Sequence, residues 1–297
     1  MNYLITGGTG FLGGHLVTKL LGNHETKIWL LTRGDKKSSD QRVHYVSWDG
    51  KSIPAIRPKI NVVINLAGKG IADSRWSDSH KKMVLQSRID SSKACVDFIL
   101  KQKEKAAVFI AGSAVGFYGG DRPGEIVDES SSPASDFLGS VCTQWEEASN
   151  GSGIRTVFLR TGVVLGKNDG PWPQIFQPYK YFVGGPLGTG EQGFPWIHVE
   201  DWVKAVIFCI DHSDISGPVI LTAPEAMNMD QFSNAIAKGS GKPNFFRVPK
   251  FALNLLLGEK SIIVWGGIMA NPTVLKKADF QWKYPDAVEA VKSLVSG

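Results

Sequence analysis

NYLITGGTGFLGGHL, residues 2–16, joins a short apolar run to a glycine-rich loop and then to a segment with apolar residues at helical spacing. In such a strand–loop–helix unit, Gly7 allows a tight turn, Gly10 lets the backbone approach a pyrophosphate, and Gly13 lets the helix pack on the strand. The helix N-terminus presents free N–H groups and the positive end of its dipole to a phosphate. The stretch predicts a dinucleotide site that contains Gly7, Thr9, Gly10, Phe11, Leu12 and Gly13.

The end of the next apolar run indicates which dinucleotide is bound. It closes on Leu31-Thr32-Arg33, where an NAD-selective site usually has an acidic residue for the ribose 2′-hydroxyl. A guanidinium can instead bind a 2′-phosphate through paired, charge-assisted hydrogen bonds. We therefore expect NADP(H) as the cofactor, with Arg33 as its selector. A solvated loop charge at Arg33 is the alternative, and Asp35 keeps NAD as the second choice.

The first half of the chain alternates short β-branched runs with amphipathic segments, which is typical of a parallel sheet with helices on both faces. The expected strands are 3–6, 27–32, 43–47, 61–66, 107–111 and 156–159, and the expected helices are 11–21, 80–101 and 137–149. We predict an α/β fold, a Rossmann-type doubly wound parallel sheet with a smaller C-terminal substrate lobe.

Composition changes to glycine, proline and aromatic residues after about Gly166. We therefore expect an NADP-binding domain over 1–165, its sheet completed by about 195–222, and a mainly substrate-binding lobe over 166–297. Gly184 to Gln192 is the candidate substrate-covering loop, with a plain connection as the alternative. Six aromatic residues line either a ligand pocket or the core of the second lobe: Trp172, Tyr179, Tyr181, Phe182, Phe194 and Trp196.

Bulk properties exclude several classes of protein. The net charge of +5, from 33 basic and 28 acidic residues, is dispersed, which argues against a nucleic-acid-binding face. The cysteines Cys95, Cys142 and Cys209 are too far apart for a disulfide framework or a metal site. Without a signal-peptide pattern or an apolar stretch of about 18 residues, we expect a cytoplasmic protein with no membrane partner.

Two further motifs, NLAG at 65–68 and SAVGFYG at 113–119, make the chain resemble the extended short-chain dehydrogenases/reductases, the branch of nucleotide-sugar epimerases and dehydratases. More narrowly it is similar to the atypical subgroup labelled NAD-dependent epimerase family protein. That similarity lies in five segments that cover residues 65–88, 137–149, 159–166, 184–202 and 278–291. A small-molecule substrate and a monomer or homodimer are expected by this resemblance.

The resemblance also implies roles for individual residues. Leu66, Ala67 and Gly68 would pass along the cofactor, with Ser87 on the following helix beside it. Arg88 would either cap a loop or meet the substrate, and Trp48-Asp49 would flank the adenine or form a turn. Arg160 follows a strand at which relatives contact substrate or cofactor.

The chain departs from the family at the catalytic positions. Classical members carry a Tyr-x-x-x-Lys pair, in which the tyrosine acts as acid or base and the lysine lowers its pKa. Counting back from Trp145-Glu146 places Leu138 at the tyrosine position and Cys142 at the lysine position. Neither side chain can perform that chemistry, so we expect non-standard catalytic residues.

Four side chains remain for proton handling near the nicotinamide, with Tyr118 as the preferred donor and Ser113 and His198 as further candidates. Tyr118 has a packing role as its alternative, and His198 a core or capping role. Cys142 is expected to be a small buried core residue rather than a reactive thiol. Glu146 and Glu147 are expected to face solvent or a helix partner.

Two functions follow from these patterns. The first is an NADP-dependent oxidoreductase or epimerase that acts on a small carbonyl or hydroxyl compound or a sugar-like substrate. The second is a redox-inert NADP(H)-binding sensor or scaffold protein, which the missing dyad would explain. The first is preferred because the loop after Gly184 and the aromatic residues indicate an enclosed ligand.

Overall fold

The computed structural model describes residues 1–74, 76–249, 251 and 267–296, so Arg75 and residues 250, 252–266 and 297 of the expected second lobe lie outside the described part. Its centre is a seven-stranded parallel sheet in the order β10-β7-β5-β4-β1-β2-β3, which confirms the predicted α/β doubly wound fold. The strands are β1 (Asn2–Thr6), β2 (Lys27–Thr32), β3 (Val43–Ser47), β4 (Val62–Asn65), β5 (Val108–Ala114), β7 (Arg155–Thr161) and β10 (Gly217–Leu221).

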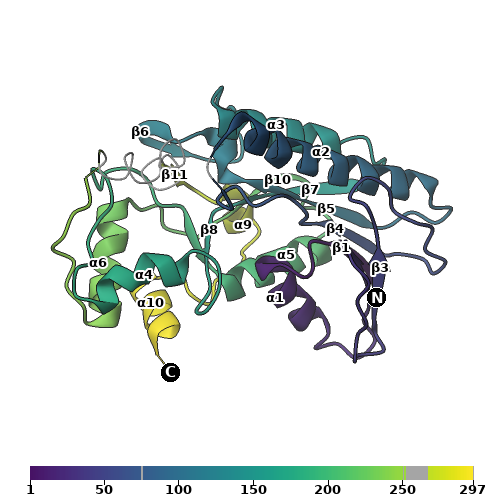
Figure 1. The fold of residues 1–297 in the computed structure, drawn as a ribbon, viewed down its shortest axis with the longest axis horizontal. Coiled ribbons are helices and arrows are strands. Elements are labelled where there is room, and N and C mark those ends of the chain that lie inside the picture. The colour runs from purple at the N-terminus through teal and green to yellow at the C-terminus, as the bar shows by residue number, and fades with distance from the viewer. Residues whose placement is uncertain (75, 250, 252–266, 297) are drawn as a thin grey trace.

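Helices cover both faces of this sheet (Figure 1). On one face lie α2 (Asp78–Lys101) and α3 (Phe137–Ser149), and on the other α1 (Phe11–Leu20) and α5 (Val199–Asp211). The side chains of Ser77 and Asp136 accept hydrogen bonds from the first turns of α2 and α3, which explains why those helices begin there. In contrast, α1 begins at Gly10 with no side-chain cap.

Each face of the sheet has its own apolar core. Leu16 of α1 and Trp202 of α5 are fully buried against β1 and its neighbours. On the opposite face, Ile99 of α2 packs with Phe109 of β5. Successive residues of a strand point to opposite faces, so a strand buried on both sides is an apolar run rather than an alternating one. This is why the central strands could be recognised in the sequence.

The later chain builds a second core around α4 (Trp172–Lys180), α6 (Met229–Ser240) and α10 (Ala287–Val295), at one end of the sheet (Figure 1). Of the six aromatic residues expected in either a ligand pocket or this core, four lie in the core: Trp172, Tyr179, Phe194 and Trp196. Tyr181 and Phe182 are exposed instead. The boundary near residue 165 remains a prediction.

Small elements connect the two parts. The pair β8 (Val163–Leu165) and β9 (Trp196–His198) is parallel, as is the pair β6 (Asp121–Val127) and β11 (Gly267–Ala270). The 3-10 turn η1 (Val115–Tyr118) follows β5, and the short helix α9 (Thr273–Lys277) follows β11. In the described part of the chain, no helix combines the length and the apolar character needed to cross a membrane.

Candidate functional site

The glycine loop after β1 is closed so tightly that Gly7 and Gly13 cannot carry side chains. Gly7 has φ +69°, and a Cβ there would lie 2.6 Å from the carbonyl carbon of Leu66. A Cβ on Gly13 would lie 2.3 Å from the carbonyl oxygen of Gly7. The amide of Gly10 donates to that same oxygen at 3.0 Å and closes the turn. The loop is therefore held between the end of β4 and the start of α1.

The start of α1 fits a phosphate group. The first-turn amides of a helix have no acceptor within the helix, and among the described residues no side chain caps those of α1. Gly10 is exposed, and the nearest atom to a Cβ there would be the Gly7 oxygen at 3.4 Å, so the space beside Gly10 is open. Uncapped amides at a helix N-terminus bind anions. The residues present therefore fit the pyrophosphate of a dinucleotide.

The end of β4 lies beside this loop and is tied to β1 and α2. The Thr6 hydroxyl donates to Asn65 Oδ1 at 2.6 Å and accepts from the Ala67 amide at 3.1 Å. The Ser87 hydroxyl on α2 accepts from the Lys69 amide at 2.9 Å. Residues 66–68 thus lie beside the glycine loop, where a bound cofactor would pass, while Ser87 holds the loop that follows them.

The end of β2 carries an exposed cation. Arg33 follows Thr32 directly, and within the described part of the chain its side chain has no hydrogen bond or ion pair. Beyond β3, the Asp49 carboxylate accepts from the amides of Lys51 and Ser52 at 2.8 Å each, which lowers the pKa of Asp49. Of the two roles expected for Asp49, flanking the adenine or forming a turn, these hydrogen bonds favour the turn. Trp48 beside it lines an open surface hollow with Ile53 and other residues.

A buried polar network joins three of the candidates at the end of β5. Arg160 on β7 binds Glu146 on α3 through both carboxylate oxygens, at 2.9 Å each. The Ser113 hydroxyl donates to Glu146 Oε1 at 2.6 Å, and Arg160 Nη1 donates to the Tyr118 hydroxyl at 2.7 Å. The expectation that Glu146 faces solvent or a helix partner is wrong, because its partner is on a strand; Glu147 is exposed.

Tyr118 lies fully inside this network, with none of its surface exposed. Burial raises the pKa of Tyr118 to about 12, although the Arg160 charge acts in the opposite direction. The phenol is therefore protonated at neutral pH. It packs against Phe117, Val127 and Ile268 as well as reaching Arg160.

His198 and Cys142 are both buried. The Nδ1 atom of His198 accepts from the Glu200 amide at 3.2 Å and so caps α5, while Nε2 lies 3.3 Å from the Ser293 hydroxyl. Burial lowers the pKa of His198 to about 4, so the ring is neutral at pH 7. Burial raises the pKa of Cys142 to about 12, which keeps it an unreactive thiol packed beside Gly116.

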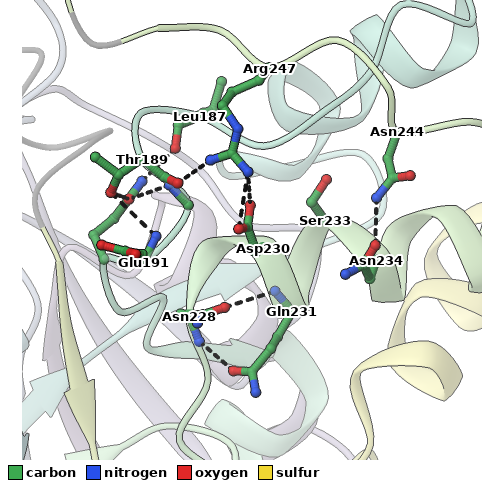
Figure 2. Close-up of polar contacts among 12 residues, drawn as sticks. Leu187, Thr189, Glu191, Asn228, Asp230, Gln231, Ser233, Asn234, Asn244 and Arg247 are labelled. Carbon is green, nitrogen blue, oxygen red and sulfur yellow. Dashed lines mark hydrogen bonds and ion pairs between the residues drawn. The ribbon is translucent and has the colours of Figure 1, made fainter. Parts of the chain in front are cut away.

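The loop from Gly184 to Gln192 is held by its own side chains and by α6 (Figure 2). The Gln192 side chain donates from Nε2 to the Leu187 carbonyl oxygen at 2.6 Å, and its Oε1 accepts from the Gly190 backbone amide at 2.9 Å. Gln192 therefore shapes its own loop. Two of the glycines serve close contacts: a Cβ on Gly185 would lie 2.3 Å from the Phe246 carbonyl oxygen, and one on Gly190 would collide with Asp230.

Two charged residues that the sequence did not single out also hold segments together, Arg247 at this loop and Glu129 at β10 and α9. Arg247 binds both carboxylate oxygens of Asp230, at 2.9 and 3.1 Å, across from the loop (Figure 2). The Glu129 carboxylate accepts from the amides of Ile220 and Val274, and thereby joins β10 to α9. Both contacts join residues far apart in the sequence, and neither has a local motif.

Comparisons with known proteins agree with this architecture. The family model described as NAD dependent epimerase/dehydratase family matches residues 3–223, and a domain of unknown function (DUF1731) matches residues 248–294. The epimerase family protein YfhF of Bacillus subtilis is 37% identical over 301 residues, which cover 100% of this chain and 98% of the relative. The epimerase family protein SH2119 of Staphylococcus haemolyticus is 35% identical over 296 residues, 99% of this chain and 98% of the relative.

Among solved structures, the human epimerase family protein SDR39U1 (isoform 2), crystallised with NADPH, has a TM-score of 0.91. It shares 26% sequence identity, and the match covers 99% of each chain. The predicted resemblance is confirmed, and the chain belongs to the NAD dependent epimerase/dehydratase family of extended short-chain dehydrogenases/reductases.

Proposed function

We propose that the chain binds NADP(H) along the C-terminal edge of its sheet and acts as an oxidoreductase or epimerase on a small or sugar-like hydroxyl or carbonyl compound. The observation that carries the proposal is the closed glycine loop, which leaves the first-turn amides of α1 uncapped beside the 66–68 segment. The human relative crystallised with NADPH supports it. The second lobe, residues 166–297, forms the part of the proposed site that binds the substrate.

Arg33 is the proposed selector between the two nicotinamide cofactors. Its guanidinium is exposed at the end of β2, the strand next to β1, and no described residue competes for it. An adenosine 2′-phosphate there would receive charge-assisted hydrogen bonds, each contributing about 1.5–3 kcal/mol. NADH has no such group, so Arg33 favours NADPH without changing NADH affinity.

The proposed proton path uses Ser113 at the end of β5. The cofactor, when bound, supplies or accepts the hydride. Because Ser113 donates its own proton to Glu146, its oxygen lone pairs are left to accept a hydrogen bond from a substrate hydroxyl. As the substrate is oxidised, its proton passes to Ser113 Oγ while the Ser113 proton passes to Glu146 Oε1. Glu146 is then neutral beside Arg160 only transiently, because loss of this proton to solvent restores the ion pair. Tyr118 acts as a positioning residue through Arg160, and His198 as the cap of α5.

The test is a calorimetric titration with NADPH and with NADH of the unchanged protein, Arg33→Ala and Arg57→Ala. Arg57 is also an exposed arginine, in the connection between β3 and β4, and serves as the matched control. We expect NADPH to bind more tightly than NADH, and Arg33→Ala to weaken NADPH about tenfold or more while NADH is unchanged. Absence of binding by either cofactor would contradict the proposal.

Turnover is tested with a panel of sugar nucleotides, aldehydes and ketones, followed through NADPH absorbance and product analysis. Analysis of the product is needed because an epimerase regenerates its cofactor. Conversion of any panel member supports the proposed activity. Tight NADPH binding with no conversion across the panel would favour a protein that holds the cofactor without using it.

A further inference from the structure

Arg88 on α2 is a half-buried cation with two donor groups left over. Its Nη1 atom donates to the carbonyl oxygens of Lys69 and Val84, at 2.9 Å each. Within the described part of the chain, Nε and Nη2 have no hydrogen-bond or ion-pair partner. Neither atom is among the fully buried polar atoms that lack a partner, so both remain accessible. The loop-capping role therefore occupies only one of the three guanidinium nitrogens.

The surroundings of Arg88 do not balance its charge. No carboxylate forms an ion pair with it in the described part of the chain, and burial lowers the pKa of Arg88. The guanidinium carbon lies 4.8 Å from the centre of the Trp145 ring, and the buried indole Nε1 of Trp145 has no hydrogen-bond partner among the residues that the structure describes. Burying a cation without a counter-charge is costly, and an oxygen ligand at the two free nitrogens would offset that cost.

The position of Arg88 indicates which ligand it meets. A Cβ on Gly68 would lie 3.2 Å from the guanidinium carbon, so Arg88 lies against the segment that follows β4. Trp145 beneath it reaches β5, because a Cβ on Gly112 would lie 2.6 Å from the Trp145 ring. Arg33 is at the end of β2, and the sheet runs β2-β1-β4-β5. A dinucleotide with its 2′-phosphate at Arg33 and its pyrophosphate at the glycine loop would place its other half at β4 and β5.

We propose that Arg88 binds the nicotinamide-side half of the cofactor, through Nε and Nη2, at a phosphate oxygen or at the hydroxyls of the nicotinamide ribose. The inference rests on the proposed function. A planar guanidinium presents two parallel donors to such paired oxygens, which an ammonium group cannot do. Cys142, one turn before Glu146 on α3, is a neutral thiol, so Arg88 supplies a positive charge that position 142 lacks.

The test compares two probes by calorimetry. One is NADPH, and the other is adenosine 2′,5′-bisphosphate, which corresponds to the adenosine half of NADPH with its 2′-phosphate and lacks the nicotinamide half. Arg88→Met keeps an unbranched side chain over Trp145 but removes the charge and the donors. We expect it to weaken NADPH about 10- to 100-fold, while adenosine 2′,5′-bisphosphate changes less than about twofold. Arg33→Ala is the matched comparison and should weaken both probes.

The outcomes separate the two proposals. Equal weakening of both probes by Arg88→Met, or no weakening of either, would overturn the assignment and leave Arg88 as a brace of the loop at Lys69. If Arg88→Met does not fold, as judged by its melting curve, Arg88→Lys replaces it, because lysine keeps the charge and removes the paired donors of the guanidinium. Arg88→Lys should weaken the binding of NADPH alone. Unchanged NADPH affinity in this variant would overturn the assignment. If the unchanged protein binds neither probe, the proposed function itself fails.

Discussion

The guanidinium of Arg160 on β7 binds both carboxylate oxygens of Glu146 on α3, and both residues are more than nine-tenths buried. This pair joins the α3 layer to the sheet at the end of β5, and it sets the acceptor for the Ser113 hydroxyl. The proposed proton path therefore depends on a contact that also stabilises the fold.

Glu146→Gln should destabilise the protein strongly, because it leaves the Arg160 charge buried without a counter-charge. Removing one partner of a buried ion pair typically costs about 3–5 kcal/mol. The double variant Glu146→Leu/Arg160→Met removes both charges, so it should recover most of that loss. Urea denaturation gives the free energy of unfolding of the unchanged protein and of both variants. If Glu146→Gln lowers it by less than about 1 kcal/mol, the ion pair is not desolvated.

Ser113→Ala should lower kcat/KM about 100-fold or more on the substrate that the panel identifies, because it removes the atom that receives the substrate proton. Tyr118→Phe loses only one hydrogen bond to Arg160 and should lower it less. The comparison is made by steady-state kinetics in the direction of substrate oxidation, at saturating NADP⁺. Full activity in Ser113→Ala would exclude the proposed path, and a larger loss in Tyr118→Phe would identify the phenol as the donor.

Two adjacent glycines of α1 should respond to alanine in opposite directions. A Cβ on Gly13 would lie 2.3 Å from the Gly7 oxygen and 2.5 Å from Gly8 Cα, whereas a Cβ on Gly14 would have no atom within 4 Å. Gly14→Ala should stabilise the protein by about 0.5–1 kcal/mol, the usual gain in helix propensity. Gly13→Ala should destabilise it and weaken NADPH binding. Melting curves and NADPH titrations check both, and similar behaviour of the two variants would contradict the packing.

His198 should make the protein less stable as the pH falls below neutrality. Burial holds the pKa of His198 at about 4, against about 6.5 in an unfolded chain, so between these values the unfolded state binds more protons. The free energy of unfolding should therefore fall by about 2–3 kcal/mol from pH 6.5 to pH 4 on account of this residue.

The matched control for that prediction is His198→Asn, which retains an acceptor for the Glu200 amide but does not titrate. Urea denaturation of both proteins across this pH range gives the difference between their free energies of unfolding. The contributions of the carboxylates, which the two proteins share, cancel in that difference. Parallel pH profiles would show that the native His198 is protonated as easily as the unfolded one.

Gln192→Ala should loosen the loop from Gly184 to Gln192, because it removes the hydrogen bonds to Leu187 and Gly190. Glu191→Ala is the control, since Glu191 is exposed and its side chain has no hydrogen bond among the described residues. We expect faster amide exchange across the loop in the first variant only. Equal exchange in both would mean that the contacts to α6 and to the Phe246 segment hold the loop without Gln192.

The central elements could be predicted because their patterns are local. β2, β3 and α3 have the bounds expected from apolar runs and helical spacing, and no end of the other predicted elements differs by more than three residues. The glycine loop could be recognised for the same reason, because strand, turn and helix follow one another within fifteen residues. The strands β6, β8, β9 and β11 were missed, because each pairs with a distant partner. β8, β9 and β11 are also too short for a period, and β6 contains a proline and a glycine, which are depleted in strands.

By itself, the sequence determined the doubly wound sheet, the glycine loop and the family, all of which depend on residues that are neighbours along the chain. Only the tertiary structure decided how the polar side chains are used, because a hydrogen bond between Glu146 and Arg160, or between Gln192 and Leu187, depends on which atoms the fold brings within 3 Å of each other. Side-chain type alone cannot distinguish a solvated carboxylate from a buried one: Glu146 and Glu147 are adjacent and chemically identical, and the fold buries only the first.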